Sequence, residues 1–333
     1  MRPRFHPRFI NGPFEDPGLY IPFIFENRAL LFDVGDIYSL TPKDILKISH
    51  VFITHTHMDH FIGFDRLLRL FLGREKQLYL YGPEGFIKNS EGKLAGYAWN
   101  LVNNFNYKLH LHLTEVHPDY VISREYKCQN KFLPTQKAVK RSFKKVLYEE
   151  PAFHVSAVIL NHSIPCLGLA LKEQFHINIK KDRLEDLELE PGPWLNEFKQ
   201  ALYDQKDVGS EFEVKFGRDK LKKRRFVLGE LAKQIALITP GQKIAYITDV
   251  VLNESNEEKI VSLAKDADHL FIEAAFLEKD FEIAKEKYHL TARQAGELAA
   301  RAGAKQFSIF HFSPRYLGQE SLLYQEASEA YKS

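Results

Sequence analysis

The chain has 333 residues, of which 44% are hydrophobic and 27% are charged. This composition can bury a core and excludes an intrinsically disordered chain. No apolar run is long enough to span a membrane, and residues 1–14 lack the continuous apolar segment of a signal peptide. The only cysteines are Cys128 and Cys166, which excludes a disulfide framework. We therefore expect a cytoplasmic protein with no membrane partner.

The net charge of +2 conceals an uneven distribution. Residues 137–145 contain five basic side chains and no acid, and residues 215–225 contain seven basic side chains and one acid, Asp219. The rest of the chain is net acidic. Basic clusters of this kind can follow a phosphate backbone, or they can be solvated loops. The charge pattern alone leaves both interpretations open.

The first elements are predicted to be strands. Residues 20–33 predict two strands joined by a tight turn. The run 33–36, Asp-Val-Gly-Asp, follows, and its carboxylates either support a metal site or cap the next turn. A buried strand is expected at 48–54, and apolar residues at helical spacing predict a helix at 64–71.

Between that strand and that helix lies the run 54–60, Thr-His-Thr-His-Met-Asp-His. His55 and His57 are two positions apart on an extended backbone, so their side chains point the same way. Asp59 and His60 turn back over them as the helix begins. Imidazoles and a carboxylate at a rigid strand end are ligands that zinc accepts. The run therefore predicts a metal site.

The next part of the chain carries two further histidines. It predicts a strand at 78–81, a helix at 86–105, strands within 107–127 and a polar, basic loop at 128–150. His110 and His112 alternate with leucines in the predicted strands, which is typical of a half-exposed strand. We interpret both histidines as surface residues and not as metal ligands.

In the rest of the chain, several more predicted apolar strands end in a residue that can bind a metal. Strands are predicted at 153–160, 167–171, 244–248, 270–272 and 307–310, and a helix at 292–302 with Thr291 as its N-cap. His162, Asp249, Glu273 and His311 stand at the ends of four of these strands. Strands of one sheet deliver their carboxyl-terminal residues to a common edge, so we expect these side chains to meet His55 there.

Residues 173–235 differ from the rest in composition. They mix charge runs with the rigid turn at 191–193, Pro-Gly-Pro. Their apolar residues look too scattered for a core of their own. We therefore expect one domain over 1–333 that carries 173–235 as an inserted, arm-like excursion.

The chain resembles the ribonuclease Z branch of the metallo-β-lactamase superfamily, enzymes that trim the 3′ end of precursor tRNA. The motifs that carry the resemblance are those at 32–36, 55–60, 81–85, 161–163, 248–249, 289–291 and 311–316. The run 190–193 is similar to the Gly-Pro motif of the family's substrate-binding arm. The resemblance implies an α/β fold, an αββα sandwich of two mixed β-sheets with helices on the outer faces. It also implies an RNA partner, a tRNA precursor, and a homodimer.

The resemblance further implies two divalent metal ions. His55, His57 and His162 would hold the first ion, Asp59, His60 and His311 the second, and Asp249 would bridge both. Zinc is the expected metal, although manganese and iron accept the same ligands. Two such ions can activate a hydroxide for in-line displacement at phosphorus.

Five residues among or near these ligands are expected to take part in catalysis or substrate binding. Asp59, besides holding a metal, can accept a proton. His289 would contact the scissile phosphate or protonate the leaving 3′-oxygen, with Glu273 holding its imidazole in the needed tautomer. Ser313 and Arg315 are candidate phosphate contacts.

Three features depart from the family pattern and keep other functions open. Ile272 stands where the family usually has a histidine, which predicts an altered relay behind His289. Val250 replaces the usual threonine, and the family's N-terminal strand and its Pro- and Arg-containing loop are not recognisable in residues 1–20. The alternative to endonucleolytic RNA hydrolysis is therefore the hydrolysis of a small phosphodiester, lactone or thioester. A third hypothesis is a metal-stabilised RNA-binding protein without activity.

Overall fold

The computed structural model describes residues 4–24, 26–135, 137–216 and 222–333. The chain divides into two units. The main unit comprises residues 4–147, 155–171 and 243–333, and the inserted unit comprises residues 148–154 and 172–242. None of the described helices is both long and apolar enough to cross a membrane.

The first sheet of the main unit has eight strands, which lie side by side in chain order. They are β1 (Arg8–Phe9), β2 (Leu19–Pro22), β3 (Ala29–Phe32), β4 (Ile48–Phe52), β5 (Lys76–Pro83), β6 (Leu109–Val116), β7 (Tyr120–Lys127) and β8 (Val139–Ser142). Strands β3 to β6 are parallel, whereas the strands on either side of them pair antiparallel. The four parallel strands therefore share one carboxyl-terminal edge.

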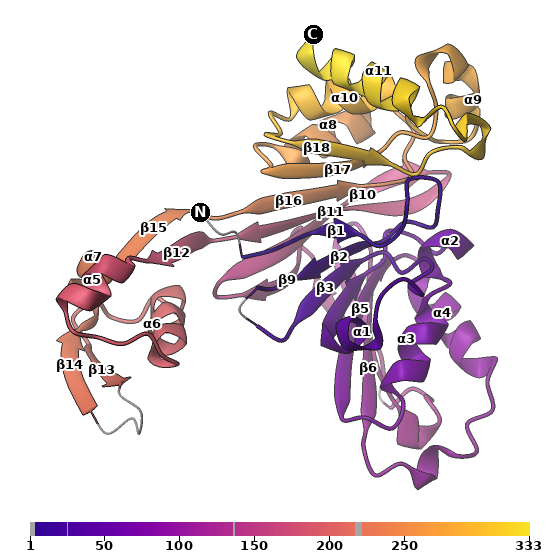
Figure 1. Cartoon of the computed structure of the whole chain (residues 1–333). Helices are drawn as coiled ribbons and strands as arrows, with labels where there is room; N and C mark the ends of the chain where they lie inside the picture. The colour runs from indigo at the N-terminus through magenta and orange to yellow at the C-terminus, as the bar shows by residue number, and fades with distance from the viewer. Residues whose placement is uncertain (1–3, 25, 136, 217–221) are drawn as a thin grey trace. The chain divides into compact units, whose positions relative to one another are not determined.

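Helices cover one face of this sheet (Figure 1). They are α1 (Pro42–Lys47), α2 (Met58–Phe61), α3 (Phe64–Phe71) and α4 (Phe86–Ala95). In α3 the apolar positions recur at helical spacing, and Phe64, Leu67 and Phe71 are fully buried. They join Leu78 and Leu111 of the sheet in one hydrophobic core. This packing holds the start of α3 against the end of β4, where the histidine run lies.

The second sheet has the order β18-β17-β16-β11-β10-β9. Its strands are β9 (Val146–Glu150), β10 (Phe153–His162), β11 (Ile164–Glu173), β16 (Lys243–Ile247), β17 (His269–Glu273) and β18 (Phe307–Phe310). Strands β16, β17 and β18 are parallel neighbours, so the residues that follow them meet at one edge. The two sheets are joined near this edge, where the Leu167 N–H donates to the Thr54 carbonyl over 2.8 Å.

The outer face of the second sheet is covered by α8 (Glu254–Ala264), α10 (Ala292–Arg301) and α11 (Glu320–Lys332), with α9 (Phe281–Glu286) nearby (Figure 1). Thr291 caps α10 through a capping box with Gln294, as its predicted N-cap role requires. Gly296 lets α11 approach α10 closely, since a Cβ there would lie 2.2 Å from the Ala327 carbonyl oxygen. Short 3₁₀-helices occur at Val102–Asn104, Cys128–Asn130, Glu278–Asp280 and Pro314–Tyr316.

The described residues of the inserted unit include two strand pairs and three helices. They are β12 (Phe175–Ile179) with β15 (Ala236–Pro240), β13 (Glu211–Phe216) with β14 (Lys222–Val227), α5 (Lys181–Asp186), α6 (Trp194–Tyr203) and α7 (Leu228–Ile235). Trp194 and Phe198 are buried, and the ring of Phe198 packs against Phe212 with centroids 5.6 Å apart. The scattered apolar residues thus do form a small core. Residues 217–221 of the second basic cluster lie outside the described residues.

Most predicted strands are confirmed, but the elements predicted for residues 86–105 and 128–150 are wrong. The helix expected at 86–105 is interrupted, because α4 ends at Ala95 before Gly96. The loop expected at 128–150 contains β8 and β9. All four residues of β8 are exposed, so this edge strand lacks the apolar alternation that a sequence pattern detects.

Candidate metal centre

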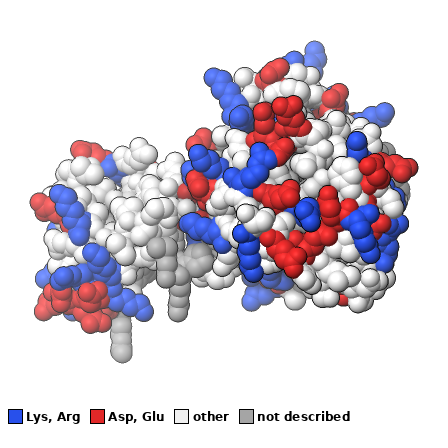
Figure 2. All heavy atoms as spheres, turned by 90° about the horizontal axis from the view of Figure 1, so that it is seen from above, with Lys and Arg blue, Asp and Glu red and all other residues white. Residues whose placement is uncertain are grey.

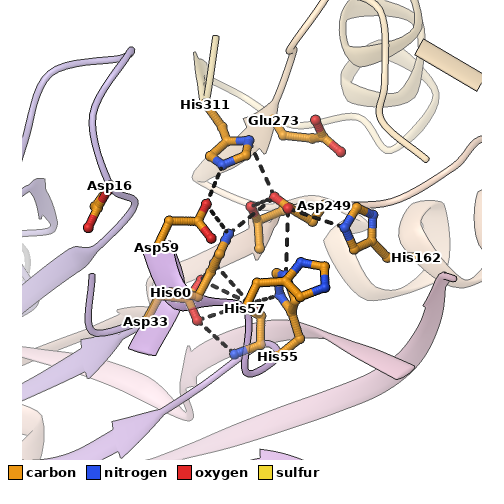
Figure 3. Close-up of polar contacts among 12 residues, drawn as sticks. Asp16, Asp33, His55, His57, Asp59, His60, His162, Asp249, Glu273 and His311 are labelled. Atoms are coloured by element: carbon orange, nitrogen blue, oxygen red, sulfur yellow. Dashed lines mark hydrogen bonds and ion pairs between the residues drawn. The ribbon is translucent and has the colours of Figure 1, made fainter. Parts of the chain in front are cut away.

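Ends of several elements bring the predicted metal ligands of the main unit together (Figure 3). His55 and His57 follow β4, Asp59 and His60 lie in α2, His162 ends β10, Asp249 follows β16, and His311 follows β18. All of these side chains point toward one another. The structure thus places every predicted ligand in one cluster, although the ligands are up to 256 positions apart in the sequence.

Asp249 lies at the centre of the cluster (Figure 3). Its Oδ2 is 3.6 Å from His55 Nε2 and 3.4 Å from His162 Nε2. Its Oδ1 is 3.4 Å from His60 Nε2 and 3.4 Å from His311 Nδ1. The two carboxylate oxygens therefore face two different pairs of histidines, which is the arrangement expected of a ligand shared by two cations.

Each half of the cluster has one further donor. Asp59 Oδ2 lies 3.3 Å from His60 Nε2 and 3.2 Å from His311 Nε2. His57 Nδ1 lies 2.9 Å from His55 Nε2. The donors fall into two groups that could each hold a metal ion, namely His55, His57, His162 and Asp249, and Asp59, His60 and His311.

Buried groups behind the cluster fix the orientation of its imidazoles. Asp33 accepts the Nδ1–H of His60 over 2.9 Å, which leaves the Nε2 lone pair of His60 directed at Asp59 and Asp249. Asp33 is itself held by the Thr54 N–H and hydroxyl and by the Tyr246 hydroxyl. Of the two roles predicted for this carboxylate, these contacts favour support of a metal ligand.

A second imidazole is oriented in the same way. His162 Nδ1–H donates to the Tyr288 carbonyl over 2.7 Å, so that its Nε2 faces Asp249. The other carboxylate of the run 33–36 behaves differently, since Asp36 Oδ1 accepts the N–H of Tyr38 and caps a turn.

The electrostatics of two ligands, His55 and Asp249, favour the forms that bind cations. Burial, together with the neighbouring His60, lowers the pKa of His55 to about 2, so this imidazole is neutral at physiological pH. Burial would raise the pKa of Asp249, but His311 and His60 hold that pKa well below its usual value. Asp249 is therefore a carboxylate despite being 2% exposed. Neutral imidazoles and ionised carboxylates are the states that ligate metals.

Two ligands of the cluster have strained backbones. Asp249 has φ of 26° and His311 has φ of 62°, and Asp33 behind them has φ of 56°. Non-glycine residues rarely adopt positive φ, at a cost of about 1–3 kcal/mol each. The positive angles turn the chain sharply as it leaves a strand and direct these side chains into the cluster.

Divalent metal ions fit this donor set. His60 Nε2 and His311 Nδ1 are buried and have no hydrogen-bond partner among the described residues. Burying an imidazole nitrogen without a partner is unfavourable, and a cation between these atoms and the carboxylates would satisfy both.

A cavity of about 300 Å³ opens beside the cluster. Its walls include the predicted residues Asp59, His289, His311 and Ser313, and also residues that the sequence did not single out, Phe14, Glu15, Asp16 and Lys287. Arg315 is not part of this lining and pairs with Asp280 over 3.3 Å. No local motif marks Asp16 or Lys287, because each reaches the cavity from a connecting segment whose path depends on the fold.

The predicted contact behind His289 is present. His289 Nδ1 lies 2.9 Å from Glu273 Oε2, and Glu273 is fully buried. Successive side chains of a strand point to opposite faces, so the neighbouring Ile272 packs in the hydrophobic core instead. The absence of a histidine at position 272 therefore leaves the pair of Glu273 and His289 in place.

Known proteins resemble the chain in sequence and in fold. Residues 230–312 match the family model described as β-lactamase superfamily domain. Proteins named ribonuclease Z from Deinococcus radiodurans and Lactiplantibacillus plantarum are each 30% identical to the chain, over 290 and 311 residues. These alignments cover 86% and 91% of this chain and 83% of each relative.

Two solved structures show the same fold. The metallo-β-lactamase fold protein YhfI from Bacillus subtilis has a TM-score of 0.55 and is 15% identical, covering 98% of this chain and 95% of that one. Human tRNase Z, short form, has a TM-score of 0.51 and is 18% identical, covering 94% and 93%. The predicted α/β fold is thus confirmed.

The similarity to the ribonuclease Z relatives identifies the chain as a metal-dependent hydrolase of the metallo-β-lactamase superfamily. Within that superfamily, the chain belongs to the ribonuclease Z family, as the extent of its similarity to the Deinococcus protein shows.

Replacing the carboxylate behind His60 tests how the ligands are oriented. We expect Asp33→Asn to weaken zinc binding roughly 10- to 100-fold, because the amide cannot hold the His60 Nδ1–H as a carboxylate does. Competition between the protein and a chromogenic chelator measures the affinity. Asp36→Asn, in the same motif, is the matched control and should bind zinc like the wild type. Equal affinities for both variants would contradict the role given to Asp33.

Proposed function

We propose that the protein is an endoribonuclease that hydrolyses a phosphodiester bond at the 3′ end of precursor tRNA. The proposal rests mainly on the two oxygens of Asp249, which face two separate histidine pairs. Two cations held side by side at a cavity can stabilise both the attacking and the leaving oxygen of an in-line displacement at phosphorus. The relatives named ribonuclease Z, similar across most of the chain, support RNA as the substrate.

The donor geometry suggests how two ions would be held. His55, His57 and His162 would bind the first, Asp59, His60 and His311 the second, and Asp249 both. Bound ions would supply Lewis acidity toward the phosphate oxygens and lower the pKa of water. We propose zinc, since imidazole and carboxylate donors suit it, while manganese and iron accept the same set.

The protein's own residues would move the protons. Asp59, whose side chain is 40% exposed at the cavity, is placed to accept a proton from the attacking water. His289 lines the same cavity and would donate a proton to the leaving 3′-oxygen. Glu273 acts through His289, because its hydrogen bond to Nδ1 directs the opposite nitrogen of the ring outward.

One observation favours a smaller substrate as the second candidate. The cavity lining includes the acids Glu15 and Asp16, and Figure 3 shows Asp16 across from Asp59. Carboxylates repel a polyanion but accept hydrogen bonds from hydroxyl groups. Hydrolysis of a small phosphodiester, lactone or thioester therefore remains the alternative.

We further propose that the inserted unit is an arm of one catalytic domain and contacts RNA through its β13–β14 hairpin. Basic and acidic side chains intermingle on this unit (Figure 2). Lys223 lies 3.4 Å from Glu213, and Arg225 lies 3.5 Å from Glu211. These exposed pairs are weak and leave the cations able to turn toward phosphates. The homodimer implied by the family, and the cytoplasmic location, stay predictions.

A cleavage assay tests the function directly. We expect the zinc- or manganese-loaded protein to cut a precursor tRNA endonucleolytically and to hydrolyse bis-p-nitrophenyl phosphate. Asp249→Ala should reduce both rates by at least about 10³-fold, because it removes the shared ligand. The absence of any RNA product from a metal-loaded sample would rule out tRNA processing. Turnover of esters alone would favour the small-substrate alternative.

The pair of Glu273 and His289 predicts a pH dependence. Burial alone would lower the pKa of His289, but the charge and hydrogen bond of Glu273 raise that pKa to about 9. The protonated imidazole thus persists as the pH rises to that value, and its acid function is lost above it. Glu273→Gln removes the stabilising charge, so the loss of activity should move to lower pH.

The changes in kcat and KM distinguish a positioning role of Glu273 from a role in substrate binding. In Glu273→Gln we expect kcat to fall roughly 10- to 100-fold with little change in KM, because an acid catalyst loses its orientation. Steady-state rates from pH 5 to 10 measure both effects. Glu278→Gln is the control variant. An unchanged basic limb in Glu273→Gln would contradict the assigned role of His289.

Charge reversal on the hairpin tests the arm. We expect Lys223→Glu to weaken tRNA binding roughly three- to tenfold and to reduce the salt dependence of binding, because a phosphate contact is lost. Hydrolysis of bis-p-nitrophenyl phosphate should not change. Lys206→Glu reverses an exposed charge elsewhere on the inserted unit and serves as the control. Equal weakening by both variants would indicate a nonspecific charge effect.

A further inference from the structure

A second His-x-His pair lies on β6, outside the candidate metal centre. His110 and His112 are two positions apart on one strand, so their side chains project from the same face of the sheet. Glu125 on the neighbouring strand β7 is directly opposite His112 in the antiparallel register. One donor atom from each of these three residues lies within 4.8 Å of the other two, a spacing that also holds within the candidate metal centre.

One distance in this cluster already suits a bound metal. His110 Nδ1 lies 3.4 Å from Glu125 Oε1. Two ligands of a tetrahedral zinc ion, each about 2.0–2.1 Å from the metal, are separated by roughly 3.3 Å. The other nitrogen of His110, Nε2, is buried and has no hydrogen-bond partner among the described residues.

His112 is fixed in orientation by its neighbours. Its ring stacks on Tyr79 with centroids 4.5 Å apart and an interplanar angle of 13°. Its Nε2 lies 3.2 Å from Gln77 Oε1, which also accepts the Tyr79 hydroxyl over 3.1 Å. Because this amide oxygen accepts, Nε2 carries the proton and Nδ1 keeps the lone pair that a metal needs. Metal-binding histidines typically donate their other N–H to such a carbonyl group.

We propose that His110, His112 and Glu125 form a peripheral binding site for one divalent transition-metal ion, with zinc as the best fit. Two imidazoles and one carboxylate are a ligand set that zinc accepts, with a fourth position left open. The ion cross-links β6 and β7 next to the exposed edge strand β8. The histidines that the sequence pattern assigned to the solvent thereby gain a binding function.

Lys127 is the natural competitor for this site. It pairs with His110 in the strand register, and its Nζ lies 3.7 Å from Glu125 Oε1. Its side chain is 40% exposed, so the ammonium group can move into solvent when a metal binds. Removing this charge should therefore strengthen metal binding, whereas a purely structural cluster would show no such response.

Zinc titration of the metal-stripped, full-length protein tests the proposal. We expect His112→Gln to bind one zinc ion fewer per chain than the wild type, as counted by isothermal titration calorimetry and elemental analysis. In an Asp249→Ala/His60→Ala background, which disables the candidate metal centre, one ion should remain, and adding His112→Gln should remove it. Lys127→Met should bind this ion several-fold more tightly.

Two controls accompany this titration: a variant outside the cluster and a check that each variant is folded. His6→Gln removes an exposed imidazole outside the cluster and should leave the ion count unchanged. Circular dichroism verifies that each variant is folded. Equal ion counts for the wild type and a folded His112→Gln variant would overturn the proposal, whatever the candidate metal centre binds. A folded double variant that binds no zinc would overturn it as well.

Discussion

The candidate metal centre depends on one buried carboxylate. Asp249 is 2% exposed, and each of its oxygens faces two imidazoles. A carboxylate is costly to bury without partners, so the histidines around it must be held in place for the fold to tolerate it. The parallel order of β16, β17 and β18 helps to hold these groups in place, because it brings Asp249, Glu273 and His311 to one edge of the sheet. A divalent cation would complete the charge balance.

Buried carboxylates that are held by fixed partners also lie behind the ligands. Asp33 is fully buried and fixes His60, and Glu273 is fully buried and fixes His289. Each carboxylate is held in turn by backbone or hydroxyl donors, such as the Val250 N–H for Glu273. Such supporting contacts orient ligands and acid catalysts, and their loss typically weakens a site without unfolding the protein. Ile272 does not disturb the contact between Glu273 and His289, because successive residues of a strand point to opposite faces.

The charge clusters illustrate how tertiary structure changes the meaning of a sequence pattern. Two basic residues of β14, Lys223 and Arg225, pair with acids on β13, and the antiparallel register of the hairpin brings these side chains together. The hairpin is therefore mixed in charge and not uniformly basic. The scattered apolar residues of the inserted unit likewise meet only after folding, because Phe198 of α6 reaches Phe212 of β13. Neither feature can be inferred from local composition.

The sequence by itself determined the ligand types, the strands that carry them and their place at strand ends, because the spacing of His55 to His60 and the apolar runs are local properties. It also placed Thr291 at a helix start, where side chain and backbone interact over three residues. Only the tertiary structure decided which oxygen of Asp249 faces which histidine. It alone placed Asp16 and Lys287 in the wall of the cavity. It also showed that Arg315 pairs with Asp280. It also revealed β8 and the cluster of His110, His112 and Glu125. These features depend on contacts between residues far apart in the chain, and such contacts follow from strand order and register, which no local pattern encodes.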